Sequence, residues 1–423
     1  MPQTKSTPDT IYSNTHKIQQ DQIDNRVIQI LAKLQQAEFL AYIVGGGVRD
    51  LVLGFKPKDF DIVTNATPEQ IRGLFKNSRI IGKRFRLIHI FYGRDIIEVA
   101  TFRAAPKVTH PDHQHPDHLA IDGQIIRDNI YGTLEEDIWR RDFTINALYY
   151  DPISDQIIDY CNGYADLKNH QIRVLGDPII RYREDPVRML RALRFSAKLD
   201  FNIESTTLKP LSDKSFHELL NNIPPARLFE EYSKLFLTGH AEKSFLILKQ
   251  HKLIHKLFPF TATNQMDSEY PQHLLFLHRV LENTDRRIQN NLPINPAFLL
   301  AAFLWHPLQL QHREFQTSNN SREHSWRLAA HKIIKKQNGH LAIPKRFTQI
   351  MEEIWYLQRL FNKTRKKAVH KAATHPKFRA GFDFLLIRSE LENINTKLLK
   401  WWQEYEAANA EQRSQMLANY SEN

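Results

Sequence analysis

Residues 43–63 read IVGGGVRDLVLGFKPKDFDIV and place a glycine turn, a short helix and a strand with two aspartates in close succession. The apolar residues that end at Val44 predict a short buried strand, which the glycines terminate. We expect a brief helix over residues 48–52, with Gly54 as its C-terminal cap, and a further strand over residues 58–63. This order of elements is typical of an α/β unit.

Asp59 and Asp61 are two residues apart on the expected strand, so both side chains leave the same face of it. Neighbouring carboxylates repel each other unless a cation lies between them, and hard oxygen ligands suit Mg²⁺. Gly45 and Gly46 precede a helix start, where free backbone N–H groups attract phosphate, and Arg49 adds a fork-shaped donor. The stretch therefore predicts a site for a nucleoside triphosphate and its magnesium.

Each of these features also has a simpler explanation. An Asp-x-Asp pair is often a solvated turn, and three glycines are often only a tight turn. A dinucleotide-binding Rossmann turn would need a third glycine where Asp50 stands, and the sequence contains no GxxxxGK[ST] loop. The order and the close spacing of the features are more specific than any one of them.

Length and composition limit the class of protein. The chain has 423 residues, enough for roughly two to four domains, and its 42% hydrophobic and 25% charged residues are typical of a soluble globular protein. The longest apolar run, residues 296–304, is about half of what spans a bilayer, so we expect no membrane-spanning helix. A single cysteine, Cys161, excludes an intrachain disulfide and fits a reducing cytoplasm. The net charge of +11 fits an enzyme that handles polyanions, or a role in solubility alone.

Further elements extend the expected α/β unit on both sides. Residues 1–22 carry acids and no apolar core segment, so we expect a polar, poorly ordered leader. Residues 23–37 have apolar residues at helical spacing, and Thr67-Pro68-Glu69-Gln70 is a typical helix start. Four more strands are expected, over residues 85–93, 95–103, 146–151 and 155–160. From about residue 180 onward the sequence predicts mainly helices.

Residues 104–124 interrupt this pattern with a Pro- and Asp-rich stretch in which HPDH occurs twice, at 110–113 and 115–118. Its four histidines suggest a zinc site. Prolines lie between them, however, and no flanking element would fix a coordination geometry. We therefore favour a surface loop.

Two acids further along the chain are candidates for the same site. Glu98 falls in mid-strand among apolar residues, where a carboxylate without a partner is costly, so it is either a third metal-site acid or part of a local salt bridge. Asp142 belongs to RRDFTINAL, residues 140–148. It could bond a ribose hydroxyl or cap the residues that follow it, and the two roles are compatible.

The segment RYREDPVRMLRALRF, residues 181–195, predicts an arginine-rich helix with Pro186 in its first turn. Asp185 and Arg188 would share one face of this helix, which Arg191 and Arg194 continue. A carboxylate beside a guanidinium can read the edge of a nucleobase. From the residues alone, a solvated i,i+3 ion pair is the simpler explanation.

Residues 44–195 resemble the nucleotidyltransferase superfamily of class II CCA-adding enzymes and bacterial poly(A) polymerases. The matching pieces are GGGVRD, KDFDIVTNATPEQ, RRDFTINALYYD and YREDPVRMLRALRF. A further matching piece, PPARLFEE, lies beyond residue 195. The resemblance implies an α+β protein that begins with a nucleotidyltransferase head containing a small mixed β-sheet. We expect the head over residues 23–178, an all-helical neck that binds the base and RNA over 179–250, and a helical body and tail that bind RNA over 251–423.

The same resemblance implies roles for single residues. It implies nucleotidyl transfer assisted by two Mg²⁺ ions at Asp59 and Asp61, with Asp142 beside the nucleotide. Arg49 and Arg141 would contact phosphate or sugar, and Arg191 would also bind the nucleotide. Asp185 and Arg188 would read the incoming base, a role that replaces the solvated ion pair.

The branch of the superfamily is indicated by RIIGKRFRLIHI, residues 79–90, which resembles the segment that marks poly(A) polymerases. We therefore expect template-independent addition of AMP from ATP to RNA 3′ ends. A CCA-adding tRNA nucleotidyltransferase is the near alternative, and a non-catalytic RNA-binding protein is the distant one. The family often ends in an arginine-rich tail, whereas this sequence ends SQMLANYSEN, a departure that leaves open whether a tail adds RNA affinity.

The expected partners are ATP and RNA 3′ ends, without a membrane, and we expect a cytoplasmic monomer. The densest cationic run is NKTRKKAVHK, residues 362–371. It is either an RNA contact or a solvated helix face. The candidate RNA-binding residues are Lys363, Arg365, Lys366 and Lys367.

Overall fold

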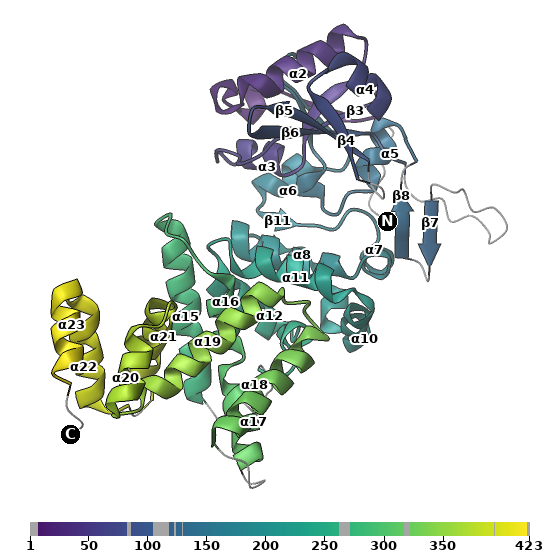
Figure 1. Ribbon diagram of the computed structural model, residues 1–423. Helices are drawn as coiled ribbons and strands as arrows, with labels where there is room; N and C mark the ends of the chain where they lie inside the picture. The colour runs from purple at the N-terminus through teal and green to yellow at the C-terminus, as the bar shows by residue number, and fades with distance from the viewer. Residues whose placement is uncertain are drawn as a thin grey trace. The chain divides into compact units, whose positions relative to one another are not determined.

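The computed structural model describes residues 7–82, 86–104, 118–121, 124–128, 130–261, 271–316, 322–392 and 394–420. The chain divides into two compact units, Met1–Leu219 and Leu220–Asn423. The first unit contains a mixed β-sheet with helices, and the described residues of the second form helices only (Figure 1). The expected neck, residues 179–250, is divided between the two units.

The sheet of the first unit has eight strands in the order β1-β10-β9-β2-β3-β6-β5-β4. Neighbouring strands are antiparallel except β3 and β6, which run parallel. Figure 1 shows α2 and α4 together on one side of these strands. The strands are β1 (Asp9–Tyr12), β2 (Ala41–Val44), β3 (Asp61–Thr64), β4 (Ser78–Ile81), β5 (Leu87–Tyr92), β6 (Asp95–Thr101), β9 (Tyr149–Asp151) and β10 (Gln156–Asp159).

Helices and smaller ladders complete the first unit. Two-stranded ladders pair β7 (His118–Ile121) with β8 (Gln124–Asp128), and β11 (Gln171–Ile172) with β12 (Asn202–Ile203). The 3₁₀ turns are η1 (Gln20–Gln22), η2 (Thr144–Asn146) and η3 (Lys209–Ser212). The α-helices are α1 (Ser13–His16), α2 (Asn25–Gln36), α3 (Gly46–Val52), α4 (Pro68–Leu74), α5 (Leu134–Trp139), α6 (Gly163–Lys168), α7 (Pro178–Glu184), α8 (Val187–Leu199), α9 (Ser205–Leu208) and α10 (Lys214–Leu219).

Local sequence signals explain where several of these elements start and stop. Thr67 and Gln70 form the expected capping box of α4, with Pro68 in its first turn. At the end of α3, Gly54 has φ +77°, its N–H donates to the carbonyl of Leu51, and the Phe55 N–H donates to that of Asp50. These two bonds form a Schellman motif, so the predicted glycine cap is confirmed.

Several expectations about local structure were wrong. Residues 7–22, expected as a poorly ordered leader, include β1 at the edge of the sheet and a buried His16. The strand expected over 58–63 begins only at Asp61. The single helix expected over 181–195 is two helices, because Pro186 disfavours a helical conformation at Asp185, whose φ and ψ are −146° and 91°.

The loop expected over residues 104–124 lies mostly outside the described residues. Its described part includes the strand β7, which pairs with β8 and is therefore not a loop. Three of the four histidines of the suggested zinc site also lie outside the described residues.

One face of the sheet packs against α5 and the residue that follows η2. Val63 and Phe102 from the sheet side, Ile138 of α5 and Ala147 after η2 belong to one buried hydrophobic cluster. This packing places Ala147 close to Val44 and Val63 of the two strands next to the glycine turn and the aspartates.

The second unit has a core of aromatic and aliphatic side chains around α16. Phe303 stacks on Phe258 with 4.1 Å between ring centroids, and Trp355 donates its indole N–H to the carbonyl of Ala301. None of the described helices is both long and apolar enough to cross a membrane. The elements are η4 (Leu220–Asn222), α11 (Pro225–Phe236), α12 (Ala241–Gln250), α13 (Ile254–Leu257), α15 (Pro271–Gln289), α16 (Pro296–Phe303), α17 (Trp305–Gln316), α18 (Arg322–Asn338), α19 (Lys345–Phe361), α20 (Lys366–Ala373), α21 (Phe378–Ser389), α22 (Thr396–Ala407) and α23 (Ala410–Ala418).

Candidate active site

The glycine turn between β2 and α3 is a position that requires glycine. Gly45 has φ +72° and ψ −132°, a conformation that a residue with a side chain rarely adopts. Its carbonyl accepts the first helical hydrogen bond, from the N–H of Arg49 at 3.1 Å. A Cβ atom on Gly45 would lie 3.5 Å from Nη1 of Arg141, so the turn also passes close to that guanidinium.

The Arg49 side chain is buried and bound within the protein. Its Nε and Nη2 donate to Asp50 at 2.8 and 2.7 Å, and its Nη1 donates to the side-chain oxygen of Asn146 at 2.9 Å. The guanidinium also lies over the ring of Phe195 of α8. Arg49 therefore joins α3, η2 and α8, a structural role that the sequence did not predict for it.

Asp59 and Asp61 are both exposed, and they bracket the half-buried Phe60. Asp61 is the first residue of β3 and is in register with Glu98 of β6, so these two side chains lie on the same face of the sheet. Glu98 is exposed rather than buried, which corrects the idea that its position in the strand makes it costly. It also lies 3.3 Å from Nε2 of His89 on β5, a contact that is an ion pair when His89 is protonated, so a local partner and the neighbouring acid are both present.

Negative charge accumulates around Asp61. The surrounding protein displaces hydration and raises the pKa of Asp61, and the carboxylates of Glu98 and Asp59 raise it further, while Arg141 opposes them. Hard oxygen donors with surplus negative charge fit a divalent cation. Among the described residues, no three acidic, histidine or cysteine side chains are gathered closely enough to hold a metal ion, so Glu98 does not complete a ligand set here.

Asp142 has the opposite environment. Its Oδ2 accepts from Nε of Arg191 at 2.8 Å and from Nη2 of the same residue. Its Oδ1 accepts from the Phe143 N–H at 2.8 Å and from Nδ2 of Asn146 at 3.2 Å. Burial alone would raise the pKa of Asp142, but these contacts, chiefly the charge of Arg191, lower it to about 2. Asp142 is therefore a fully ionised partner of Arg191 on α8.

Asn146 was missed as a site residue although it lies inside the RRDFTINAL motif. Its side-chain oxygen accepts from Arg49 and its amide donates to Asp142, so one side chain connects the glycine-turn helix to the Asp142–Arg191 pair. The signal was its position in the motif, four residues after Asp142.

Arg141 is held by two residues that the sequence did not single out. Its Nε donates to the hydroxyl of Tyr149 at 2.7 Å and its Nη2 to Asp137 at 3.1 Å. Tyr149 in turn donates to the same buried carboxylate. Burial would lower the pKa of Arg141, but Tyr149 and Asp137 raise it, so the side chain carries a fixed positive charge near Asp61. The four-residue spacing of Asp137 and Arg141 was the available signal.

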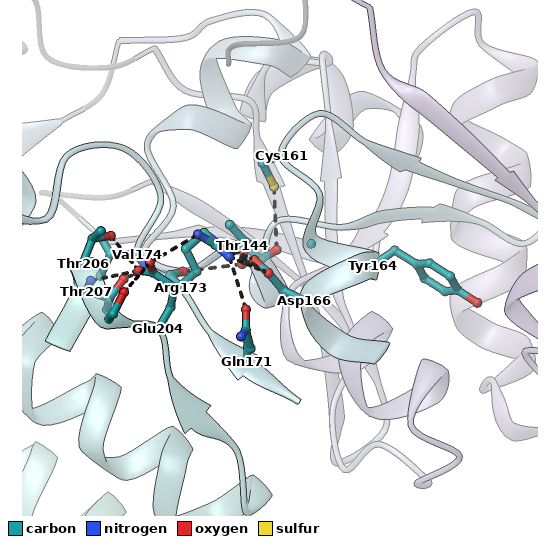
Figure 2. Close-up of polar contacts among 12 residues, drawn as sticks. Thr144, Cys161, Tyr164, Asp166, Gln171, Arg173, Val174, Glu204, Thr206 and Thr207 are labelled. Carbon is teal, nitrogen blue, oxygen red and sulfur yellow. Dashed lines mark hydrogen bonds and ion pairs between the residues drawn. The ribbon is translucent and has the colours of Figure 1, made fainter. Parts of the chain in front are cut away.

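A second polar cluster anchors η2 from the side of α6, and Figure 2 shows its side chains pointing toward one another. Thr144 Oγ1 donates to Asp166 Oδ2 at 2.7 Å, and its backbone N–H donates to the carbonyl of Arg173 at 3.0 Å. Arg173 pairs with Asp166 at 3.0 Å and with Glu204 at 3.6 Å. Burial raises the pKa of the nearby Cys161 thiol well above its usual range, which disfavours the thiolate form.

The proposed base-reading residues lie at the break between α7 and α8. Asp185 Oδ1 accepts from the N–H of Val187 at 3.2 Å. Arg188 is buried, and its Nη1 donates to the carbonyl of Arg181 at 2.8 Å and to Glu184 at 3.3 Å. Within the described part of the chain, no hydrogen bond is made by its Nε or its Nη2.

The cationic run of the second unit is exposed. Lys363 and Arg365 precede α20, while Lys366 and Lys367 open it, so the run is mostly a helix start rather than a helix face. Cations at a helix N-terminus are unfavourable because they meet the positive end of the helix dipole. The stability of α20 therefore does not explain this placement.

Comparisons with known proteins show to which family the chain is similar. Three family models match the chain: "Poly A polymerase head domain" over residues 41–173, "Probable RNA and SrmB- binding site of polymerase A" over 200–264, and "Polymerase A arginine-rich C-terminus" over 318–423. A Poly(A) polymerase I of Haemophilus influenzae is 45% identical over 395 residues, which cover 92% of this chain and 86% of that protein. A Poly(A) polymerase I of Escherichia coli O157:H7 is 43% identical over 411 residues, 96% of this chain and 88% of the relative.

CCA-adding enzymes are similar over less of the sequence but share the fold. The enzyme of Lactobacillus helveticus is 39% identical over 247 residues, 58% of each chain. The solved CCA-adding enzyme of Bacillus stearothermophilus in complex with CTP covers 94% of this chain, with 88% of its own chain covered, at 21% identity and a TM-score of 0.60. A complex of CCA-adding enzyme with ATP has a TM-score of 0.62 at 23% identity, covering 94% of this chain and 86% of its own. At these identities the structural likeness shows the fold alone.

The match to the polymerase head domain and the named relatives show that this chain is a nucleotidyltransferase, with a mixed sheet that carries the glycine turn and the paired carboxylates. The extent and identity of the matches show that this chain belongs to the bacterial poly(A) polymerase family. The predicted α+β fold with a helical second part, the family and the class of polynucleotide adenylyltransferase are thereby confirmed.

Proposed function

We propose that this chain carries out template-independent polyadenylation beside the ends of the interior strands β2 and β3, where Gly45, Asp61 and Arg141 lie close together. The observation that carries this proposal is the excess of negative charge at Asp61 beside a glycine turn and a fixed guanidinium. The carboxylates would bind cations, and the turn and Arg141 would bind the phosphates of ATP. AMP would pass to an RNA 3′ hydroxyl with release of pyrophosphate.

Two Mg²⁺ ions are the proposed metals, and Asp59 and Asp61 would hold them, with Glu98 as a third acid close by. Such ions activate the attacking hydroxyl and neutralise the departing pyrophosphate. The chain's own part is to position the reacting groups. Gly45 and Gly46 would offer backbone N–H groups in a turn where no side chain obstructs a phosphate.

The residues around Asp142 have a positioning role in this proposal. Asp142 holds the Arg191 guanidinium, Asn146 ties that pair to Arg49, and Arg49 fixes α3 and its glycine turn. Substrate contacts from Arg191 and Arg141 would then come from preorganised side chains, which lose little freedom when the nucleotide binds. A direct bond from Asp142 to the ribose is not needed.

Asp185 and Arg188 are proposed to read the incoming base. A carboxylate accepts from the exocyclic amine of adenine, and the unbonded nitrogens of Arg188 can donate to a ring acceptor. Guanine would turn its O6 acceptor toward the carboxylate and leave a buried group unpaired. This arrangement favours ATP over GTP.

The single assay that tests the activity uses purified protein, Mg²⁺, an unstructured oligo(A) primer and each of the four NTPs in turn. We expect long products with ATP and little extension with GTP or UTP. Efficient CTP addition to a tRNA without its terminal CCA, with growth ending after the CCA is complete, would instead indicate the CCA-adding activity.

RNA is proposed to contact the exposed cations at the start of α20. Phosphate contacts make the affinity depend on salt, with a slope in log affinity against log salt of roughly −0.7 per contact for a single strand. Changing Lys363, Arg365, Lys366 and Lys367 together to Gln should therefore flatten the slope for oligo(A) binding by up to roughly 3. An unchanged slope would identify the run as a solvated surface.

We also propose that the enzyme acts as a monomer in the cytoplasm. The free thiol of Cys161 fits a reducing compartment. Sedimentation of the purified protein at several concentrations would test the oligomeric state.

A further inference from the structure

Arg181 of α7 binds the backbone that leads into Asp142. Its Nη2 donates to the carbonyl of Arg140 at 2.9 Å and to that of Arg141 at 2.5 Å. Arg140 is the C-terminal cap of α5, so these carbonyls lie where a helix leaves its acceptors without internal partners. A guanidinium at this place satisfies both acceptors and fixes the path of the chain at residues 140–142.

The same arginine is bound to the proposed base-reading side chain. Arg181 Nη1 donates to Glu184 at 2.6 Å, and Arg188 donates to that same carboxylate at 3.3 Å. Arg188 also donates to the backbone carbonyl of Arg181 at 2.8 Å. A continuous series of polar contacts therefore runs from Arg188 through Glu184 and Arg181 to the residues beside Asp142.

This series is electrostatically costly, which argues against a role in stability alone. Two guanidinium groups share one carboxylate, and only 12% of the Arg181 side chain is exposed. Burial lowers the pKa of Arg181, the charge of Arg188 lowers it further and Glu184 opposes both, so that it falls to about 10. A neutral side chain could pack between α7 and α5 without this cost.

We propose that Arg181 is a positioning residue that couples recognition of the base at Arg188 to the placement of Arg141 and Asp142. The inference rests on the proposed base-reading role of Arg188. When adenine engages Arg188, the position of this guanidinium is fixed, and Glu184 and Arg181 hold the 140–142 backbone in the reactive arrangement. A base that does not bond to Arg188 leaves its guanidinium free to change position, and the 140–142 backbone is then held less firmly. Part of the discrimination between ATP and GTP is therefore expressed in kcat rather than in KM.

The test uses Arg181→Lys, because a lysine keeps the charge but cannot reach two carbonyls and a carboxylate at once. Arg183→Met is the matched control, since Arg183 lies on the same helix, is exposed and contacts the ring of Phe216. We expect Arg181→Lys to lower kcat with ATP by about tenfold or more, with little change in the KM for ATP and a higher ratio of GTP to ATP incorporation. Arg183→Met should behave like the unchanged enzyme.

A purely structural role for Arg181 gives a different result. It would lower the melting temperature and the amount of active enzyme while kcat per folded molecule and the GTP to ATP ratio stayed unchanged. That outcome would overturn the inference. Active-site titration alongside each rate measurement separates the two cases.

Arg188→Lys distinguishes failure of this inference from failure of the proposed function. If Arg188→Lys loses discrimination and Arg181→Lys does not, the base-reading role stands and the coupling is wrong. If Arg188→Lys keeps full discrimination, the base-reading role fails and the coupling fails with it. Coupling also requires that the double variant Arg181→Lys/Arg188→Lys discriminate between ATP and GTP no less well than the less selective single variant. If the two residues acted independently, the losses of discrimination in the single variants would multiply.

Discussion

Asp61 and Asp142 lie in the same compact unit, yet their carboxylates have opposite surroundings. Asp142 is enclosed by Arg191, Asn146 and the Phe143 N–H, and its charge is fully compensated. Asp61 faces other acids, and its pKa is raised rather than lowered. The difference indicates that the two carboxylates fit different roles: Asp142 completes a network of internal contacts, whereas the charge of Asp61 is left for the proposed metal ion to balance.

The largest effect expected from this comparison is on catalysis. Asp61→Asn and Asp59→Asn should each reduce AMP incorporation at least about 100-fold, because each removes a charge that would hold a metal ion. Initial rates with oligo(A), ATP and Mg²⁺ measure the loss. Asp95→Asn is the control, since Asp95 is an exposed acid at the start of the neighbouring strand β6. If either variant retained more than a few per cent of the activity, the assignment of Asp59 and Asp61 as the metal ligands would be wrong.

The second effect is on folding, where the two acids should differ in sign. Asp142→Asn should lower the free energy of unfolding by about 2 kcal/mol, because the pKa of Asp142 falls from 3.8 to about 2 in the folded protein. Asp61→Asn should raise it, since a charge that loses hydration on folding and faces other acids is removed. Urea unfolding in EDTA measures both variants. A destabilised Asp61→Asn would contradict the comparison.

The dependence on pH provides a sharper form of this contrast. The pKa of Asp142 is depressed, so its stabilisation is present above the ordinary pKa of 3.8 and is lost as the pH falls toward about 2. The pKa of Asp61 is raised, so its ionisation weakens the fold, and this penalty is absent below 3.8 and grows as the pH rises. The free energy of unfolding of each variant, minus that of the unchanged protein, should therefore grow in magnitude as the pH rises from 2.5, when measured in EDTA. The difference should be negative for Asp142→Asn and positive for Asp61→Asn. Curves that run parallel for the two variants would contradict the contrast between the two aspartates.

The smallest expected effect concerns Glu98, whose charge is partly compensated and is therefore intermediate between those of Asp61 and Asp142. It contributes to the negative charge at Asp61 but also has a partner in His89. We expect Glu98→Gln to slow AMP incorporation by about tenfold, less than the change of either aspartate. His89→Asn tests whether the ion pair matters by itself. Equal losses in the two variants would assign Glu98 to the ion pair alone.

Much of the site could be predicted because its signals are local. The glycine turn, the capping box at Thr67 and the stop at Gly54 each depend on a few consecutive residues, and the structure has all three. The break at Pro186 was also present in the sequence, but the arginine-rich pattern on either side of it suggested one continuous helix. Two short helices resulted because the residue before a proline avoids the helical region.

The errors concern residues whose environment is set by distant parts of the chain. The leader was expected to be disordered because it is polar, but a polar strand can pair along the edge of a sheet through its backbone, as β1 does with β10. Glu98 was expected to be in a costly position because its neighbours in sequence are apolar. Alternation along the strand turns those neighbours to the other face and leaves Glu98 exposed.

The sequence by itself determined the glycine turn, the helix caps and which residues are candidates for the site, because glycine conformation, helix caps and the two-residue period of a strand act over short distances. Only the tertiary structure decided which charges would be compensated. Arg191 meets Asp142 across 49 residues, and Glu98 meets Asp61 only because β3 and β6 pair in parallel. Such contacts depend on the order and register of strands and on helix packing, which no short stretch of sequence specifies.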